Sequence, residues 1–198
     1  MTSADDIPLD PVQAKTPAPG GSSRRSKGRG ALSWVLTVVV ALAATFAIKT
    51  WVLQVYSIPS ESMVPALMID DRVVVSKLSG DPGRGDIIVF DRPQNDVTID
   101  PAAPKVLIKR VIGLGGETVD APEGLVTIDG KPLDESYLPD GTRTVITAPI
   151  VVPEGKVLVM GDNRGSSKDG RVFGPISTST IVGRGVLRVW PLDRFGGL

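Results

Sequence analysis

Two kinds of side chain in this sequence have types and spacing suited to hydrolysis: serines in a proline-bounded loop and lysines within apolar runs. The loop YSIPSESMVPAL (residues 56–67) holds Ser60 and Ser62 between two prolines. A serine hydroxyl becomes an effective nucleophile when a neighbouring base removes its proton. The chain has no histidine, which excludes a Ser-His-Asp triad. Ser62 is therefore either an ordinary loop serine or the partner of a lysine distant in sequence.

A lysine acts as a general base only when its amine is neutral. At the ordinary lysine pKa of about 10.4, about one lysine in 2,500 is neutral at pH 7. Burial among apolar groups disfavours the ammonium and lowers the pKa by up to several units. In VLIKRVIG, strand alternation places Lys109 on one face with Leu107 and Val111. Lys77 also shares a face with apolar residues, but it stands at the end of its run. Each lysine taken alone also fits an edge residue that covers apolar surface.

A third stretch, VMGDNRGSSKDGRVFGPI (residues 159–176), concentrates charged and hydroxyl side chains directly after an apolar run. A solvated loop is one interpretation. A calcium-binding loop is another, although the EF-hand spacing is absent. The third is a polar network that holds a buried lysine amine in line by hydrogen bonds.

The composition excludes several classes of function. The formal net charge is zero, so we expect no nucleic-acid partner. The chain has no cysteine, which excludes disulfides and thiol catalysis. Without histidine or cysteine the usual transition-metal ligands are missing, and no spacing of carboxylates proposes a magnesium or calcium site. We therefore expect no metal and no cofactor.

The N-terminal part predicts a membrane anchor. Residues 1–30 are polar and rich in Pro, Gly and Ser, which predicts a disordered cytoplasmic tail. The run Ala31–Ile48 has 18 residues and no charge, and as a helix it would be about 27 Å long, close to the hydrocarbon thickness of a bilayer. We expect a transmembrane helix over residues 31–50. The basic cluster before it predicts a cytoplasmic N-terminus.

Two alternatives to this anchor are a buried core helix and a cleavable signal peptide. The small-x-small pattern Ala41-Leu42-Ala43 lies inside the apolar run rather than after it, so we favour an uncleaved signal anchor. With either membrane segment, residues 51–198 lie outside the cytoplasm. The expected protein is a single-pass protein of the plasma membrane.

Residues 51–198 show the pattern of a mainly β domain. Short β-type runs are separated by Gly, Pro and Asp turns: DRVVVSKL, GDIIVFDR, VLIKRVIGL, VTIDGKPL, TVITAPIVV, KVLVMGD and VGRGVLRVWPL. Asp129-Gly130 predicts a hairpin turn. We expect an antiparallel β-sheet fold of the sandwich or partial-barrel type.

Four stretches, in this order, resemble the motifs of one family, the bacterial type I signal peptidases. They are IPSESMVPAL (58–67), DDRVVVSKL (70–78), RGDIIVF with VLIKRVIGLGGETV (84–90 and 106–119) and MGDNRGSSKDGRVFG (160–174). The closing RVWPLDRFG extends a resemblance that covers nearly all of residues 56–192. The family consists of membrane-anchored serine proteases with a Ser-Lys dyad, and the resemblance implies that catalytic fold, shared with LexA-like proteases.

The resemblance also implies roles for individual residues. Ser62 matches the nucleophile, and Lys109, rather than Lys77, matches the general base. Ser60 matches the residue whose hydroxyl joins the backbone N–H of Ser62 in the oxyanion hole, and Ser167 matches a serine that hydrogen-bonds the lysine amine. Charged residues that match ion-paired supports of the site are Asp162, Arg110, Asp169 and Arg171. Apolar residues that we expect near the bound substrate are Ile58, Met63, Leu67, Leu107 and Ile108.

The sequence departs from the family pattern at two positions within the matched stretches. Ala66 stands where members commonly have threonine, which affects a supporting hydrogen bond. Leu107 replaces a frequent tyrosine, which reshapes the substrate pocket slightly.

The implied activity is removal of N-terminal signal peptides from exported preproteins, with cleavage after Ala-x-Ala-like motifs. The implied partners are membrane-tethered preproteins and the lipid bilayer, and we expect a monomer. Three alternatives stay open: a LexA-type self-cleaving or repressor-cleaving protease, an anchored β-sandwich binding module without catalysis, and a processing peptidase of the same fold with few clients. The membrane span and the last polar loop disfavour the first.

Overall fold

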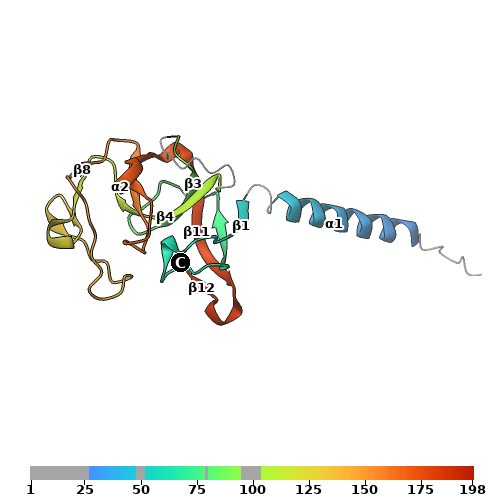
Figure 1. Cartoon of the computed structure of the whole chain (residues 1–198). Coiled ribbons are helices and arrows are strands. Elements are labelled where there is room, and N and C mark those ends of the chain that lie inside the picture. Colours follow the sequence, from blue (N-terminus) through green and yellow to red (C-terminus); the bar gives the residue numbers. More distant parts are fainter. Residues whose placement is uncertain (1–26, 48–51, 79, 95–103) are drawn as a thin grey trace, which may run out of the picture. The chain divides into compact units, whose positions relative to one another are not determined.

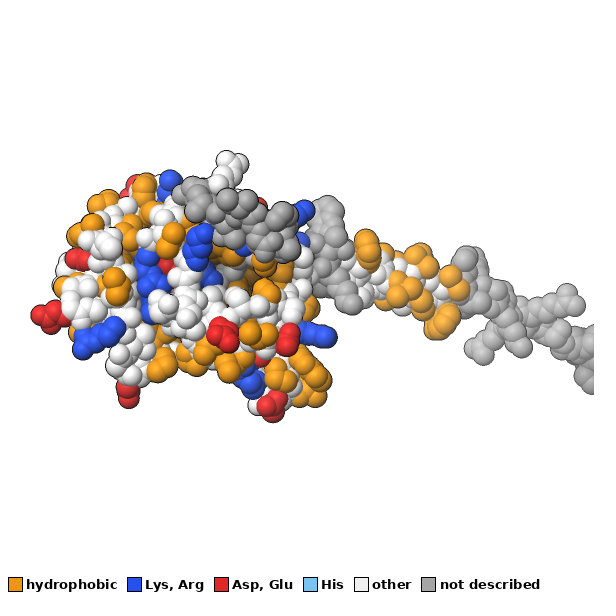
Figure 2. All heavy atoms as spheres, viewed as in Figure 1, with side chains coloured by type: hydrophobic (Ala, Val, Ile, Leu, Met, Phe, Trp, Pro, Cys, Tyr) orange, Lys and Arg blue, Asp and Glu red, His pale blue; other side chains and the backbone are white. Residues whose placement is uncertain are grey.

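The computed structural model describes residues 27–47, 52–78, 80–94 and 104–198. Helix α1 (Lys27–Ala47) begins inside the segment predicted to be disordered, at Lys27 rather than at residue 31. The other parts of the predicted tail and anchor, residues 1–26 and 48–50, lie outside the described residues. Many apolar side chains of α1 are exposed (Figure 2). Within the described ranges, no helix combines the length and apolar character needed to cross a membrane.

The part from residue 52 onward forms two antiparallel sheets (Figure 1). The eight-stranded sheet has the order β1-β2-β11-β3-β4-β9-β10, with β12 paired to β11. Its strands are β1 (Leu53–Ser57), β2 (Arg72–Ser76), β3 (Ile87–Asp91), β4 (Val106–Gly113), β9 (Lys156–Met160), β10 (Ile176–Ser177), β11 (Ile181–Trp190) and β12 (Gly196–Gly197). The four-stranded sheet has the order β7-β6-β5-β8: β5 (Thr118–Asp120), β6 (Thr127–Ile128), β7 (Lys131–Pro132) and β8 (Ile150–Val151). The prediction of a mainly β, antiparallel fold is confirmed.

Helical turns occupy several of the connections. They are η2 (Glu61–Met63), η3 (Pro122–Gly124), η4 (Thr178–Thr180), η5 (Leu192–Arg194) and the short helix α2 (Gly170–Phe173). Helix α2 begins where the side chain of Asp169 accepts a hydrogen bond from the backbone N–H of Arg171, as an N-cap residue does. The sequence pattern did not predict α2.

Strand β4 lies in the interior of the larger sheet. It pairs along one edge with β3 and along the other with β9, and most of its residues are buried. Burial on both faces explains its near-continuous apolar sequence. Apolar clusters cover both faces: one includes Met63 and Leu67 from the serine loop, and another includes Phe90 and Phe173. The charged pair Lys109-Arg110 therefore enters the centre of the domain.

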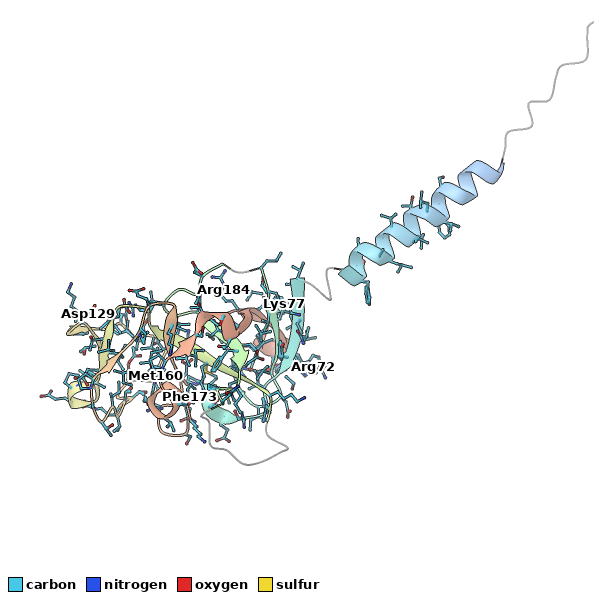
Figure 3. All side chains as sticks on the ribbon, turned by 90° about the horizontal axis from the view of Figure 1, so that it is seen from above. Arg72, Lys77, Asp129, Met160, Phe173 and Arg184 are labelled. Atoms are coloured by element: carbon cyan, nitrogen blue, oxygen red, sulfur yellow. The ribbon has the colours of Figure 1, made fainter. Side chains whose placement is uncertain are left out.

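The smaller sheet tests two predictions. Asp129 and Gly130 have φ of 50° and 76°, the left-handed conformation that a two-residue hairpin turn requires, and the predicted hairpin is confirmed. Figure 3 shows Asp129 at the opposite end of the domain from Arg72 and Lys77. The run TVITAPIVV was predicted as one strand, but only its part Ile150–Val151 forms β8. The earlier part includes Pro149, which has no N–H to donate to a ladder.

Candidate active site

Ser62 lies on the turn η2, at the tip of a loop closed by backbone hydrogen bonds. The N–H of Ile58 donates to the carbonyl of Asp71 at 3.0 Å, and the N–H of Asp70 donates to the carbonyl of Ile58 at 2.9 Å. Met63 and Leu67 are both 0% exposed and pack in the core. Their burial fixes the turn that carries Ser62.

This packing corrects two predicted substrate contacts. Met63 and Leu67 were expected to bind substrate, but neither lines the pocket beside Ser62. Their side chains belong to the apolar cluster beneath the loop. From the sequence alone, an apolar loop residue could contact substrate or pack in the core. In this structure both side chains pack in the core.

The structure brings Lys109 to Ser62. The Nζ atom of Lys109 lies 2.6 Å from Ser62 Oγ and donates a second hydrogen bond to the carbonyl of Ile108 at 2.9 Å. Lys109 is 4% exposed and Ser62 is 8% exposed. Ser60 Oγ lies 3.3 Å from Ser62 Oγ, so the two serine hydroxyls and the amine form one cluster.

The predicted apolar face around Lys109 is present. Lys109 pairs across the ladder with the buried Ile88, and Leu107 and Val111 pack in the same cluster as Ile88. Burial lowers the pKa of Lys109 to about 8, although the negative charges of Asp169 and Asp162 act to raise it. With this pKa, about one lysine amine in ten is neutral at pH 7.

Lys77, the competing lysine, lies at the sheet surface. Its residue is exposed, and its backbone N–H donates to the carbonyl of Val52 at 2.9 Å. Figure 3 shows Lys77 close to Arg184, at one end of the domain. Of the two lysines, the structure places Lys109 within hydrogen-bond distance of Ser62.

A pocket of about 270 Å³ opens beside the two serines and Lys109. Its walls include Ile58, Leu107 and Ile108, three of the five residues expected to contact substrate. Two backbone segments line it, residues 56–60 and residues 106–109. The ladder between β4 and β9 begins only at Arg110. In the described part of the chain, residues 106–109 therefore have no ladder partner on that edge of β4.

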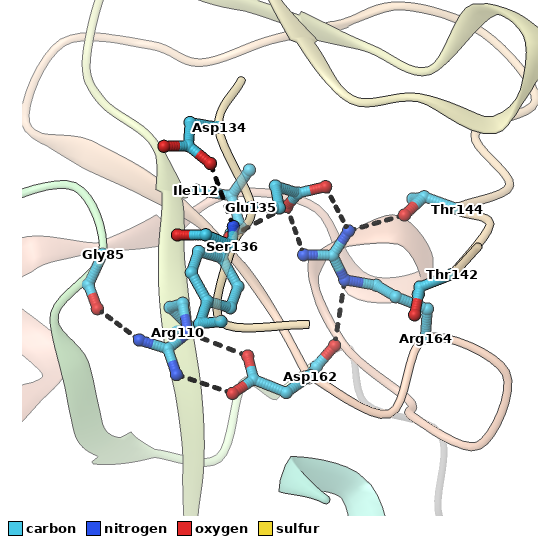
Figure 4. A network of polar contacts seen from close by, with 12 residues as sticks. Gly85, Arg110, Ile112, Asp134, Glu135, Ser136, Thr142, Thr144, Asp162 and Arg164 are labelled. Carbon is cyan, nitrogen blue, oxygen red and sulfur yellow. Dashed lines mark hydrogen bonds and ion pairs between the residues drawn. The ribbon is translucent and has the colours of Figure 1, made fainter. Parts of the chain in front are cut away.

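Arg110 and Asp162 form a buried two-point ion pair (Figure 4). Arg110 Nε donates to Asp162 Oδ1 at 2.8 Å, and Nη2 donates to Oδ2 at 2.6 Å. Arg110 Nη1 donates to the carbonyl of Gly85 at 2.8 Å. The guanidinium carbon also lies 4.1 Å from the ring centroid of Tyr137, a cation–π distance. This pair joins the strand of Lys109 to the polar loop after β9.

Arg164 extends this network to residues that the sequence analysis did not identify. It donates to both carboxylate oxygens of Glu135, at 2.5 and 3.1 Å, and to Thr144 Oγ1 at 2.5 Å. The hydroxyl of Tyr137 donates to Glu135 at 2.8 Å, and burial together with the charge of Glu135 raises the pKa of Tyr137. These residues come from the connection between β7 and β8, where no motif marks them.

Asp169 and Arg171 form a second buried ion pair. Arg171 donates to the Asp169 carboxylate from Nε at 2.8 Å and from Nη2 at 2.9 Å, and the N–H of Gly161 donates to it at 2.8 Å. Burial acts to raise the pKa of Asp169, but the hydrogen bonds and charge of Arg171 outweigh it and hold the pKa below its usual value. The carboxylate stays ionised near the amine of Lys109.

Ser167 lies near the site without the contact that the resemblance implies. Lys109 donates instead to Ser62 Oγ and to the carbonyl of Ile108, and the buried Ser167 hydroxyl helps to lower the pKa of Asp169. Gly161 separates it from the nucleophile: a Cβ on Gly161 would lie 2.2 Å from Ser167 Oγ and 2.3 Å from the carbonyl oxygen of Ser62. Only glycine fits this close approach.

The described residues contain no group of three or more acidic side chains that could hold a metal ion. The site combines a serine hydroxyl, a buried lysine amine of lowered pKa, a second hydroxyl and an open pocket. This set of groups is suited to acyl transfer.

Comparison with known proteins identifies the family to which this site belongs. The family model described as signal peptidase, peptidase S26, matches residues 31–190. The chain therefore belongs to the signal peptidase family.

Individual relatives cover most of the chain. A protein named Signal peptidase I from Leptolyngbya laminosa is 37% identical over 201 residues, covering 100% of this chain and 97% of that protein. Signal peptidase IB from Staphylococcus aureus (strain N315) is 34% identical over 184 residues, covering 83% of this chain and 92% of that protein. The crystal structure of a signal peptidase I from Enterococcus faecalis V583 is 30% identical, with a TM-score of 0.44, and covers 53% of this chain and 97% of that one.

Proposed function

We propose that this chain is a serine endopeptidase that removes signal peptides from exported preproteins, with Ser62 as nucleophile and Lys109 as general base. One observation carries the assignment of the dyad: a buried lysine amine, with its pKa lowered to about 8, lies 2.6 Å from the serine hydroxyl. The family of the chain supplies the reaction and the substrate class.

The first half of the reaction forms an ester on Ser62. Neutral Lys109 accepts the proton of Ser62 while Oγ attacks the scissile carbonyl carbon. The oxyanion that develops accepts hydrogen bonds from the Ser60 hydroxyl and the backbone N–H of Ser62. The carbon–nitrogen bond then breaks, and the Lys109 ammonium gives its proton to the leaving amine. In the second half, Lys109 takes a proton from the water that attacks the ester carbon. The Lys109 ammonium then gives that proton to Ser62 Oγ as the ester C–O bond breaks, and the acyl group leaves with a new C-terminal carboxyl group.

The pocket supports binding of the substrate as an extended strand. Residues 56–60 and 106–109 line it, and the described edge of β4 at residues 106–109 has no ladder partner toward β9. A peptide added at such an edge forms main-chain hydrogen bonds while its alternate side chains enter pockets. Ile58, Leu107 and Ile108 would contact the small side chains at positions −1 and −3.

The supporting residues act through position and charge. Arg110–Asp162 fixes the loop after β9 against β4, and Asp169–Arg171 holds parts of that loop to one another. By the family resemblance, Ser167 would hydrogen-bond the amine of Lys109 during the reaction. A rigid set of surrounding hydrogen bonds holds reacting groups in productive geometry.

The membrane topology is part of the same proposal. Residues 1–30 form a cytoplasmic tail, residues 31–50 a single transmembrane anchor, and residues 51–198 an extracytoplasmic catalytic domain in a β-sandwich or partial-barrel fold. The uncharged run Ala31–Ile48 and the exposed apolar side chains of α1 support the anchor. Ser62 follows Ile48 by 14 residues, so an extended chain keeps it within about 50 Å of the bilayer.

Lipid contact and the monomeric state rest on two further observations. Large apolar side chains near the C-terminus are exposed, namely Trp190, Leu192 and Phe195, as expected of a surface that meets a membrane. The serine, the lysine and the pocket all come from one chain, so a single copy contains the whole site.

A non-catalytic binding module is the main alternative from another class. It gives no reason for an amine with lowered pKa to be buried against a serine, an arrangement that destabilises a fold. A peptidase with few clients remains compatible with every observed contact, and the range of precursors cleaved distinguishes it.

The test of the proposed function uses the full chain in detergent and a labelled precursor whose apolar segment ends in Ala-x-Ala. Product masses locate the cut. We expect cleavage after the alanine at −1, none of a precursor with leucine at −1, and none by Ser62→Ala. Equal product from the wild type and Ser62→Ala would show that Ser62 is not the nucleophile.

A further inference from the structure

The stretch RVWPLDRFG near the C-terminus contacts the loop that carries Ser62. We infer that Arg188 and Arg194, together with Asp71, form a clamp that positions the nucleophile for attack. We call these three residues the C-terminal clamp. The inference rests on the proposed function, because it assigns the clamp a role in the reaction of Ser62.

The two arginines bind the chain directly after the turn η2. Arg188 Nη1 donates to the carbonyl of Ala66 at 2.6 Å, and Arg194 Nη2 donates to the carbonyl of Pro65 at 3.3 Å. These carbonyls belong to the third and fourth residues after Ser62. Strand β11 and the turn η5 thus reach within a few residues of the nucleophile from a segment more than 120 positions away.

Asp71 completes the clamp at the base of the same loop. It is 1% exposed, and both its carboxylate oxygens lie 3.0 Å from Arg194 Nη1. It also accepts a hydrogen bond from the backbone N–H of Met68 at 2.9 Å. A buried carboxylate without such partners is strongly destabilising, so Asp71 holds Arg194 in place while Arg194 holds the loop.

Arg188 and Arg194 are also joined to each other. Arg188 Nε donates to the carbonyl of Arg194 at 2.5 Å, so one guanidinium bridges the C-terminal turn and the serine loop. Only a planar guanidinium offers donors in two such fixed directions, whereas a lysine ammonium acts as a single point charge. The bridge therefore depends on arginine at position 188. A lysine there should restore one of the two hydrogen bonds but not both.

The clamp matters for catalysis because the reacting contact is short. Ser62 Oγ and Lys109 Nζ come from segments 47 residues apart and meet at 2.6 Å. Burial of Met63 and Leu67 fixes one side of the turn, and the clamp fixes the carbonyls that follow it. A displacement of about 1 Å in such a contact lowers a rate by up to about 100-fold. The side-chain hydrogen bonds of Arg188 and Arg194 reach the carbonyls that follow Ser62 rather than the pocket segment 106–109, so we expect a smaller effect on substrate binding than on rate.

The test compares kcat and KM for Arg188→Gln, Arg188→Lys and Arg194→Gln in the full chain, at a temperature well below each measured Tm. The matched control is Arg184→Gln, on the same strand, because Arg184 is 44% exposed at its side chain and binds Asp86 instead of the loop. We expect Arg188→Gln and Arg194→Gln to lower kcat about tenfold or more with KM within about twofold. Arg188→Lys should recover part of kcat, and Arg184→Gln should match the wild type.

Other outcomes separate this inference from the proposed function. The clamp would be overturned if folded Arg188→Gln and Arg194→Gln had wild-type kcat, or if they lost activity only through a raised KM. Either result would leave the Ser62–Lys109 proposal intact. If Arg188→Gln does not fold, a lowered kcat in folded Arg188→Lys supports the clamp and an unchanged kcat overturns it. Absence of cleavage by the wild type would instead count against the proposed function.

Discussion

Arg110 donates from Nε and Nη2 to the two carboxylate oxygens of Asp162, at 2.8 and 2.6 Å. Arg110 directly follows Lys109 in β4, and Asp162 lies in the loop after β9, so the pair fixes the strand of the proposed base against the polar loop. Its partners Tyr137 and Gly85 enclose the same guanidinium. The residue next to the proposed catalytic lysine is therefore held in place by an ion pair, a hydrogen bond and an aromatic ring.

Removal of one partner of this pair should destabilise the fold. Asp162→Ala leaves the buried Arg110 guanidinium without its carboxylate, and we expect a loss of about 3 to 5 kcal/mol in the free energy of unfolding. Arg184→Ala breaks an exposed ion pair with Asp86 and should cost at most about 1 kcal/mol. Denaturant unfolding of both variants measures the difference. Equal losses of unfolding free energy in the two variants would show that the buried ion pair contributes no more to stability than the exposed one.

The activity should rise with pH. Catalysis requires neutral Lys109, and burial lowers its pKa to about 8. The value of kcat/KM should therefore increase about tenfold per pH unit below pH 8 and level off above it, because kcat/KM reports the free enzyme. A series of initial rates between pH 6 and 9.5 measures this rise of kcat/KM with pH. A flat profile across pH 7 to 9 would be incompatible with Lys109 as the base.

Lys109 should also make the fold less stable than an apolar residue would. The folded pKa of about 8 lies below the ordinary value of 10.5, so between these pH values the unfolded chain binds more protons and stability rises with pH. Below pH 8 the penalty is complete, about 3 kcal/mol for a shift of this size.

Lys109→Met should therefore be inactive but more stable than the wild type at pH 7. The gain should be up to about 3 kcal/mol and should shrink between pH 8 and pH 10. Unfolding free energies of both proteins at pH 7 and pH 9.5 test this. A gap that does not change with pH would mean that the amine has an ordinary pKa in the folded state.

Sequence patterns identified the apolar face around Lys109 but could not choose between the two lysines by themselves. Lys77 also follows apolar residues on its face. What separates the two is a contact between segments 47 residues apart, which no local period contains. The family resemblance made that choice from neighbouring motifs, and in the structure the amine beside Ser62 Oγ is that of Lys109.

Other parts of the site depend on packing that the sequence does not encode locally. Met63 and Leu67 are apolar loop residues, and only the folded core shows that they face inward. Glu135 and Thr144 bind Arg164 from a connection without regular periodicity. Ser167 was assigned a hydrogen bond to the lysine that this structure does not contain.

The hydroxyl of Ser60 should contribute to rate more than to binding. Its Oγ lies 3.3 Å from Ser62 Oγ, close to where the oxyanion would form. Ser60→Ala should lower kcat about 100- to 1,000-fold with little change in KM, as expected for loss of one oxyanion donor. Steady-state kinetics on the Ala-x-Ala precursor measure the split. Ser60→Thr, which keeps a hydroxyl, should retain part of the rate; equal loss in both variants would argue against a donor role.

The most direct measurement of the central claim is cleavage of the Ala-x-Ala precursor by Ser62→Ala, Lys109→Met and Lys77→Met beside the wild type at pH 8. Circular dichroism and Tm confirm that each variant is folded. The Ser62–Lys109 dyad predicts that the first two variants produce no mature product and that Lys77→Met matches the wild type. Mature product from folded Lys109→Met at the wild-type rate, or its loss in folded Lys77→Met alone, would contradict the dyad.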